Sequence, residues 1–317
     1  MKIYIPHSDD LKTGKGFFCR RLASACLKMG VNVVVDPSQP HDVSLQISKI
    51  KPANTKIRVF RVDGVIHNLD RDYKSANKTI ASHLHAANAV VYQSNFSRNM
   101  CDRYLGPCKK DSAIILNGDD PSRFEGSPVV PHEHKHNVIA SSRWRPHKRL
   151  TDIIYSFLEA DIADSCLYVA GDISKGGLSK SDRSQAISGG KVKFLGKLPQ
   201  EELASYYNLC KVVVHLCWFD CCPNSLVEAI CAGCVPVTNN TGGNPEICEP
   251  AGGSVCQIDK EYNLKPVHLY KPPTIDRSKV SEAIRWAMDS KEKPKTDHID
   301  IKNVARQYLD FFAKLLK

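Results

Sequence analysis

Short apolar runs alternate with longer segments in which apolar residues recur every three or four positions, and this alternation occurs twice along the chain. Short apolar runs bounded by Gly, Pro, Asn or Asp are typical of buried strands, whereas the longer spacing is typical of helices that pack on a sheet. Strands that alternate with helices form βαβ units around a parallel sheet. The pattern therefore predicts an α/β protein with two doubly wound domains.

The first set of elements opens with a strand at residues 2–6 and an amphipathic helix over residues 17–30. Further strands are expected at 31–36, 43–47, 56–64, 89–94 and 112–118. Two more helices are expected to begin near Arg71 and after Ser94, a residue type that commonly caps a helix N-terminus. The alternation then stops at residues 127–136, which are rich in proline and histidine.

The second set opens with a strand at 137–142 and a helix that carries a full apolar stripe. The stripe consists of Leu150, Ile153, Ile154, Phe157 and Leu158. Further strands are expected at 166–171, 191–196, 211–216 and 235–239, with helices at 199–210, 223–233 and 279–290. A last amphipathic helix is expected over 299–317. Its apolar stripe indicates that it packs on another apolar surface but does not identify which element provides that surface.

A length of 317 residues suits two domains of roughly 150 residues each. We expect an N-terminal domain at 1–133, a second domain at 134–298 and the last helix at 299–317. Open α/β sheets bind ligands at the carboxyl ends of their strands. The chemistry should therefore lie in a cleft between the carboxyl ends of two sheets.

Composition narrows the class of protein. The 42% of apolar and 25% of charged residues are ordinary for a globular protein, and no apolar stretch is long enough to span a bilayer. The N-terminus turns polar after five residues and reads as a first strand, so a secretion signal is not expected. Thirteen cysteines, several within apolar runs, are expected to be reduced, and the protein is expected to be cytoplasmic.

A net charge of +10 is compatible with binding to nucleic acid or with peripheral contact to an anionic membrane. A basic but solvated surface is the simpler interpretation, because no basic run exceeds four residues. No nucleic-acid-binding motif is present, so a nucleic-acid partner is not favoured.

The segment FDCCPNSLVE, at 219–228, places Asp220 in the loop after a strand and Glu228 in the second turn of the next helix. Backbone N–H groups at such a helix start suit hydroxyl or phosphate oxygens, and neighbouring carboxylates suit sugar or ribose hydroxyls. The residues that would line this binding loop are Cys222, Pro223, Asn224, Ser225, Leu226 and Glu228. Taken alone, the segment is equally compatible with an ordinary loop acid and a solvated helix acid.

The longer stretch HLCWFDCCPNSLVEAICAGCVPVTNNTGGNPEI resembles the signature of the retaining family 4 glycosyltransferases, whose GT-B architecture has two Rossmann-like domains facing each other across a cleft. That signature has an acid, seven residues and a glutamate, then a Gly–Pro turn and a Gly-Gly-x-x-Glu loop. Its counterparts here are Asp220, Glu228, Ala229, Gly233, Pro236, Gly242, Gly243 and Glu246.

Other segments extend the resemblance over nearly the whole chain. SRWRPHKR resembles the family's Arg, four residues, Lys loop and supplies Arg143 and Lys148, a basic pair that can neutralise a departing diphosphate. GKGFF resembles its glycine-rich loop, with Gly14 and Gly16 split by a lysine. KFLGKLPQEELASYY, which contains the expected donor-site residue Leu198, matches a further landmark.

The resemblance implies a glycosyltransferase that moves a sugar from a nucleotide-sugar, UDP- or GDP-sugar above all, to the hydroxyl of a sugar, glycan or glycolipid. It also implies retention of the anomeric configuration and a reaction that needs no metal or other cofactor. It implies that Glu228 holds the ribose, while Asp220 and neighbouring amides hold the sugar. RVDGV lies where the family places the sugar side of its first domain, so Asp63 is a candidate contact for a sugar hydroxyl or the acceptor, with His67 as the fallback.

Several features leave alternatives open. Asp220 is one methylene shorter than the family's glutamate, and Cys221 and Cys222 replace Gly and Phe, so an idle nucleotide-sugar or polyanion binding protein is a second hypothesis. A transferase acting on modified nucleic-acid bases is a third. CAGC at 231–234 has the spacing of a zinc or redox site but no second CxxC, and HEHKH at 132–136 reads as a polar linker.

Overall fold

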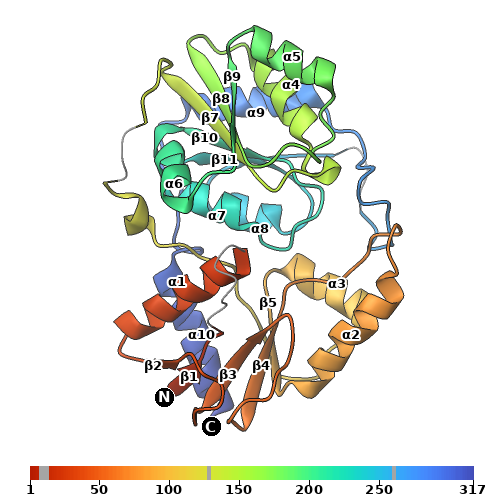
Figure 1. Ribbon diagram of the computed structural model, residues 1–317, viewed down its shortest axis with the longest axis vertical. Coiled ribbons are helices and arrows are strands. Elements are labelled where there is room, and N and C mark those ends of the chain that lie inside the picture. Colours follow the sequence, from red (N-terminus) through yellow and green to blue (C-terminus); the bar gives the residue numbers. More distant parts are fainter. Residues whose placement is uncertain (7–13, 127–129, 259–261) are drawn as a thin grey trace. The chain divides into compact units, whose positions relative to one another are not determined.

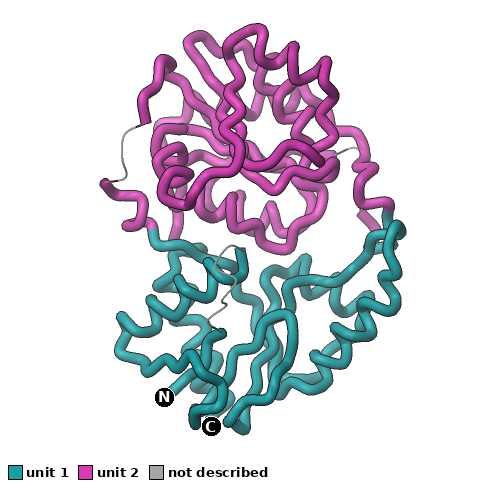
Figure 2. The backbone as a smooth tube through the Cα atoms, in the orientation of Figure 1, with its two compact units in different colours: residues 1–120, 264–267, 297–317 teal, residues 121–263, 268–296 magenta. Residues whose placement is uncertain are grey.

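The computed structural model describes residues 1–6, 14–126, 130–258 and 262–317. The chain forms two compact units (Figure 2). Unit 1 consists of Met1–Asp120, Leu264–Val267 and Asp297–Lys317, and unit 2 consists of Pro121–Asn263 and His268–Thr296. Each unit is an α/β domain built on one parallel six-stranded sheet, as the alternating pattern predicts.

The sheet of unit 1 has the order β2-β1-β3-β4-β5-β6 (Figure 1). Its strands are β1 (Lys2–Tyr4), β2 (Asn32–Val34), β3 (Val43–Ile47), β4 (Ile57–Val62), β5 (Ala89–Tyr92) and β6 (Ser112–Ile114). Its helices are α1 (Gly14–Lys28), α2 (Tyr73–Ala86), α3 (Asn95–Leu105) and α10 (Ile301–Leu315). Ser94 caps α3 as expected, because its side chain accepts a hydrogen bond from the Ser97 N–H.

The sheet of unit 2 has the order β12-β11-β10-β7-β8-β9. Its strands are β7 (His136–Ser141), β8 (Ser165–Ala170), β9 (Val192–Gly196), β10 (Val212–His215), β11 (Val235–Asn239) and β12 (Ser254–Cys256). All residues of β8, β10 and β11 are buried, which is typical of strands in a parallel sheet covered on both faces.

Helices cover both faces of this second sheet (Figure 1). They are α4 (Leu150–Ala160), α5 (Lys180–Ser188), α6 (Gln200–Leu209), α7 (Asn224–Cys231), α8 (Asn244–Cys248) and α9 (Arg277–Asp289). Two short turns of 3-10 helix, η1 (Pro121–Phe124) and η2 (Pro146–Lys148), lie in the connections. The stripe predicted on α4 is buried at Leu150, Ile153, Ile154 and Phe157.

The C-terminal helix α10 belongs to unit 1, although the chain reaches it only after unit 2. Ile301, Val304, Ala305, Tyr308, Phe311 and Phe312 join the same buried core as Phe18 and Leu22 of α1. Backbone hydrogen bonds from the Asp119 N–H to the Ile299 carbonyl and from the Ile301 N–H to the Asp119 carbonyl fix where α10 starts. The structure thereby supplies the partner that the amphipathic pattern left open.

Some local assignments differ from the sequence predictions. α5, α8 and β12 were not predicted, because α8 and β12 are very short and only Ala186 is buried in α5. The expected division after residue 133 differs from the units observed, since unit 2 starts at Pro121 and Asn208 of α6 donates a hydrogen bond to the Phe124 carbonyl. None of the described helices is both long and apolar enough to cross a bilayer.

Candidate active site

The strand order of unit 2 creates a switch point between β7 and β10. These strands are neighbours, but the chain leaves β7 toward β8 on one side and leaves β10 toward β11 on the other. Loops that diverge in this way open a crevice at the carboxyl ends of the strands, where doubly wound sheets bind ligands. The loop after β7 carries Arg143 and Lys148, and the loop after β10 carries Asp220.

Lys148 and Asp220 meet at this switch point. The distance between Lys148 Nζ and Asp220 Oδ2 is 2.7 Å, and the side chains are only 14% and 28% exposed. Burial disfavours the charged form of both groups. The attraction between the two opposite charges is stronger than this effect, so the pKa of Lys148 is raised and the pKa of Asp220 is lowered. The structure therefore presents a charged ammonium and a charged carboxylate at neutral pH.

Backbone hydrogen bonds connect the loops that carry this pair. The Trp218 N–H donates to the His147 carbonyl over 2.8 Å, which joins the loop after β10 to the loop after β7. The Gly243 N–H donates to the Asp220 carbonyl, also over 2.8 Å, which joins it to the loop after β11. At Gly242, whose φ is +68°, a Cβ atom would lie 2.5 Å from the Asp220 carbonyl oxygen. The Gly-Gly pair thus allows the chain to pack directly on the acid.

Two buried amide side chains also hydrogen-bond to the loop after β10. Asn239 Nδ2 donates to the Leu216 carbonyl over 2.8 Å, and Asn244 Nδ2 donates to the Cys217 carbonyl over 3.0 Å. Asn244 also donates to Asn239 Oδ1. Because both amides are fully buried, these bonds fix the loop that leads to Asp220.

Glu228 lies on α7 and is 7% exposed, so it is not the solvated helix acid that the sequence left possible. The pKa of the Tyr207 phenol is raised, first by burial of the phenol and second by the nearby negative charge of Glu228. The Tyr207 hydroxyl is hydrogen-bonded to Ser141 Oγ at 2.5 Å, at the carboxyl end of β7. A carboxylate held inside the protein beside the switch point is suited to a specific polar ligand.

The start of α7 offers fewer N–H groups to a ligand than the sequence suggests. The Cys222 N–H donates to the Asp220 carboxylate, and the Leu226 N–H donates to the Pro223 carbonyl. Pro223 and Cys222 are buried, whereas Asn224 and Ser225 are partly exposed. The N–H groups of Cys222 and Leu226, at the two ends of this loop, therefore already have acceptors within the protein.

The remaining candidates are Arg143 and Leu198 in unit 2 and Gly14 and Gly16 in unit 1. Arg143 is exposed, and no ion pair joins it to Asp220 among the described residues. Leu198 is partly buried just before α6. Gly14 and Gly16 open α1 in unit 1, Gly14 exposed and Gly16 buried.

Asp63 is the centre of a polar network in unit 1, at the carboxyl ends of β3, β4 and β5. Its Oδ1 accepts from Gln93 and lies 3.1 Å from Arg61 Nη2. Its Oδ2 accepts from Ser48 over 3.1 Å and lies 3.3 Å from Lys15 Nζ. Both oxygens therefore have partners already. His67, the fallback, is partly buried, and burial lowers its pKa.

Two residues of the unit 2 site went unnoticed in the sequence. His215 and Cys217 flank the end of β10, and one ring nitrogen of His215, the Cys217 sulfur and the Asp220 carboxylate lie within 4.8 Å of one another. Burial and the nearby Lys148 lower the pKa of His215 to about 3, so it is neutral. The spacing His-x-Cys-x-x-Asp was the available signal.

Among the residues that the structure describes, the other sulfur and histidine motifs do not form a comparable group. All thirteen cysteines are free thiols, and Cys234 Sγ donates to the carbonyls of Tyr207 and Cys210. In the histidine-rich segment, His134 Nδ1 lies 3.4 Å from Asp164 Oδ1. Both motifs thus have structural contacts within unit 2.

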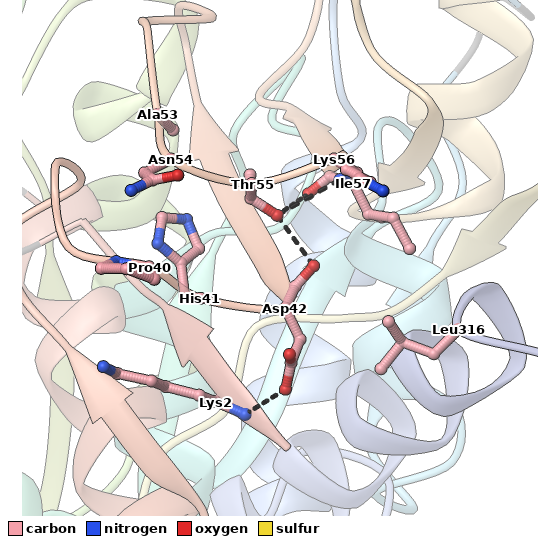
Figure 3. Close-up of a pocket in the computed structure, with 10 residues that line it drawn as sticks. All are labelled: Lys2, Pro40, His41, Asp42, Ala53, Asn54, Thr55, Lys56, Ile57 and Leu316. Carbon is pink, nitrogen blue, oxygen red and sulfur yellow. Dashed lines mark hydrogen bonds between the residues drawn. The ribbon is translucent and has the colours of Figure 1, made fainter.

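Unit 1 also contains a pocket of about 600 Å³ at the amino ends of its strands (Figure 3). Its walls include Lys2, His41, Asp42, Thr55 and Leu316. Asp42 Oδ2 accepts from the Lys2 N–H, and Thr55 Oγ1 donates to the Asp42 carbonyl. This pocket lies at the strand ends opposite to those that carry Asp63.

Several solved structures have the same fold as this chain over nearly its whole length. Sucrose-phosphate synthase from Thermosynechococcus elongatus matches with a TM-score of 0.69 and 14% identity, over 99% of this chain and 98% of that one. HepE from Anabaena, in complex with UDP-glucose, matches with a TM-score of 0.64 and 15% identity, over 99% and 100%. WaaG, a glycosyltransferase of lipopolysaccharide biosynthesis, matches with a TM-score of 0.60 and 13% identity, over 100% and 97%. These likenesses confirm the GT-B fold.

No curated protein matches the chain in sequence. The sequence model of the family described as glycosyl transferases group 1, however, matches residues 124–296. This range is more than half of the chain and covers almost all of unit 2, including the Lys148–Asp220 pair and Glu228. The chain therefore belongs to the group 1 glycosyl transferases.

Proposed function

We propose that this protein transfers a sugar from a nucleotide-sugar, UDP- or GDP-linked, to the hydroxyl of a sugar, glycan or glycolipid, with retention of the anomeric configuration. The observation that carries the proposal is the Lys148–Asp220 ion pair at the switch point of unit 2, which occurs in the same unit as the buried Glu228 of α7. A cation that remains charged and a buried acid in the same unit are suited to a ligand with both phosphates and hydroxyls.

In this proposal Glu228 accepts hydrogen bonds from the ribose hydroxyls of the donor. The residue is buried, and hydrogen bonds to a buried charged acceptor are strong, so a ribose hydroxyl pair that reaches this carboxylate would bind specifically. Asn224, Ser225 and Leu198 would line the donor site, together with Cys222, Pro223 and Leu226, which shape the loop. Gly14 and Gly16 would let the backbone of unit 1 come close to the ligand.

Lys148 and Arg143 would stabilise the diphosphate as it leaves with additional negative charge. Asp220 keeps Lys148 charged and in place and faces the transferred sugar. The leaving diphosphate itself would take the proton of the acceptor hydroxyl on the same face of the sugar, which gives retention. No metal cofactor is needed in this scheme, because the cation at the phosphates is the ammonium.

Asp63 has a supporting part in this scheme. Because both its carboxylate oxygens already accept hydrogen bonds or pair with cations, Asp63 orients Ser48 and Lys15. We expect those side chains to meet the acceptor or the sugar of the donor, with Asp63 behind them.

HepE is described in complex with UDP-glucose, and this supports UDP-sugars as the first donors to try. The experiment is a thermal-shift screen of UDP-, GDP-, ADP- and dTDP-sugars, followed by measurement of free nucleoside diphosphate with candidate sugar acceptors. A ligand at 100 times its dissociation constant stabilises the folded protein by about 2.7 kcal/mol, which such a screen resolves. The anomeric configuration of the product is then read by NMR.

A sugar nucleotide that stabilises the protein but releases no diphosphate with any acceptor would indicate the idle binding protein instead. An inverted product would refute retention. Absence of any shift with all four donors, combined with strong salt-dependent binding to duplex DNA, would favour the nucleic-acid alternative.

A further inference from the structure

Three side chains with metal-binding atoms meet beside Lys148. One ring nitrogen of His215, the sulfur of Cys217 and a carboxylate oxygen of Asp220 lie within 4.8 Å of one another. They come from the end of β10 and from the loop that Asn239 and Asn244 hold in place. The group is therefore rigidly supported.

The burial of these side chains distinguishes the group from a chance cluster of surface acids. His215 is 5% exposed and Cys217 is 1% exposed. The Nε2 atom of His215 is buried and has no hydrogen-bond partner among the described groups. A buried polar atom without a partner is unusual in a folded protein, and a bound ligand would satisfy it.

The donor set fits a particular class of metal ion. Imidazole, thiolate and carboxylate together are ligands of zinc, and three protein ligands leave a fourth tetrahedral position open. The side chain of Asp220 is 28% exposed, which provides a path by which a hydrated ion can enter.

The ammonium of Lys148 already occupies part of this site. It is 2.7 Å from Asp220 Oδ2 and is also hydrogen-bonded to the sulfur of Cys217. Two of the three metal ligands are thus the partners of Lys148. A divalent cation and this ammonium cannot hold them at the same time, because the two positive charges repel each other at such distances.

We propose that His215, Cys217 and Asp220 form a binding site for zinc or a similar divalent transition-metal ion, which competes with the ammonium of Lys148. On binding, the Cys217 thiol loses its proton to water, a sulfur–metal bond forms, and Lys148 turns toward solvent with its charge retained. One further consequence rests on the proposed function: zinc should inhibit sugar transfer, because Lys148 is then no longer available to the diphosphate.

Cobalt(II) titration tests the site without any need for activity. The probe is Co²⁺ alone, and the readout is the thiolate-to-cobalt charge-transfer absorption. We expect one such site in the wild-type protein, loss of its absorption in Cys217→Ser, and an unchanged spectrum in the control variants Cys108→Ser and Cys221→Ser. Removal of the competing charge in Lys148→Met should tighten Co²⁺ binding by at least about tenfold.

A charge-transfer absorption that persists in Cys217→Ser, or equal Co²⁺ affinity of Lys148→Met and wild type, would overturn the proposal. His215→Ala provides a second check, because it should weaken Co²⁺ binding while keeping the sulfur signal at high concentration. Where transfer is measurable, zinc should inhibit it and a chelator should restore it. If no transfer is found with any donor, the proposed function fails while the Co²⁺ titration still decides the metal site.

Discussion

At the scale of single residues, the site is organised by charges that are paired inside the protein. Lys148 is paired with Asp220, while Glu228 is buried on α7 next to the element that carries Tyr207. The carboxylate of Asp220 keeps the ammonium of Lys148 charged. The two acids therefore have different partners and should respond differently to neutralisation.

Neutralising the two acids should separate their roles. Glu228→Gln is expected to weaken binding of free UDP by about 1.5–3 kcal/mol, because a buried charged acceptor for the ribose is lost. Asp220→Asn is expected to leave UDP affinity unchanged or to raise it, since Lys148 is released toward the diphosphate, yet to slow transfer. Calorimetry with UDP and a diphosphate-release assay measure the two effects, with the exposed Glu201→Gln of α6 as control. Equal losses of UDP affinity in both variants would show that the acids share one structural role.

The Lys148–Asp220 pair also predicts a pH dependence of stability. The pKa of Asp220 is lowered in the folded protein, so its contribution to stability is present above about pH 3.9 and is lost as the pH falls through the folded pKa. The pKa of Lys148 is raised, so its contribution is present below about pH 10.4 and is lost as the pH rises through the folded pKa. Asp220→Asn should therefore be less stable than wild type between those limits, and the difference should shrink on acidification. Urea midpoints at a series of pH values measure this. A difference that stays constant down to pH 2 would contradict it.

At the scale of elements, the loops after β7, β10 and β11 act as one assembly. The loop after β10 is bonded to the loop after β7 through Trp218 and to the loop after β11 through Gly243. The contact between Gly242 and the backbone of Asp220 leaves no room for a side chain. The glycine is needed both for its positive φ and for this approach.

Gly242→Ala should displace Asp220 and thereby impair transfer. A Cβ at this position would lie 2.5 Å from the Asp220 carbonyl oxygen and 2.9 Å from its nitrogen, so the loop must shift. A displacement of this size is expected to reduce kcat about 10- to 100-fold. Gly252→Ala is the matched control, because Gly252 has a φ of +81° but nothing within 4 Å of the added Cβ. The control should lower the melting temperature without changing kcat, and a similar loss of kcat in both variants would count against the role of the contact.

At the scale of the whole molecule, the chain returns to unit 1 to complete it. The helix α10 packs on α1 and contributes six residues to the core, so unit 1 depends on residues that follow the whole of unit 2 in the sequence. The chain therefore passes between the two units more than once.

Phe312→Ala should destabilise unit 1 selectively. Phe312 is fully buried, and truncation of a buried Phe typically costs about 3–5 kcal/mol. Amide hydrogen exchange should show faster exchange in α1 and β1, while β8 and β10 of unit 2 keep their protection. Lys302→Ala, at an exposed position of the same helix, serves as control. Equal loss of protection in both units would show that they unfold together.

The class of fold and most of its elements could be predicted from local patterns in the sequence. Apolar periodicity is a local property, since each strand or helix must bury one face whatever its neighbours are, so α4 and β8 could be placed without a structure. The same holds for Asp220 and Glu228, because their positions in a loop and on the following helix depend only on nearby residues. Elements without an apolar stripe, such as α5, gave no such signal, although Ser179 and Asp182 form a capping box there.

Contacts between distant residues could not be predicted in this way. Lys148 and Asp220 are 72 positions apart in the sequence, and they touch because β7 and β10 became neighbours in the sheet. The same strand order brought His215 and Cys217 beside Lys148, and the crossing of the chain back to unit 1 gave α10 its partner. Strand order and chain crossings follow from the packing of all elements at once. The periodicity of a single segment therefore does not predict strand order or chain crossings.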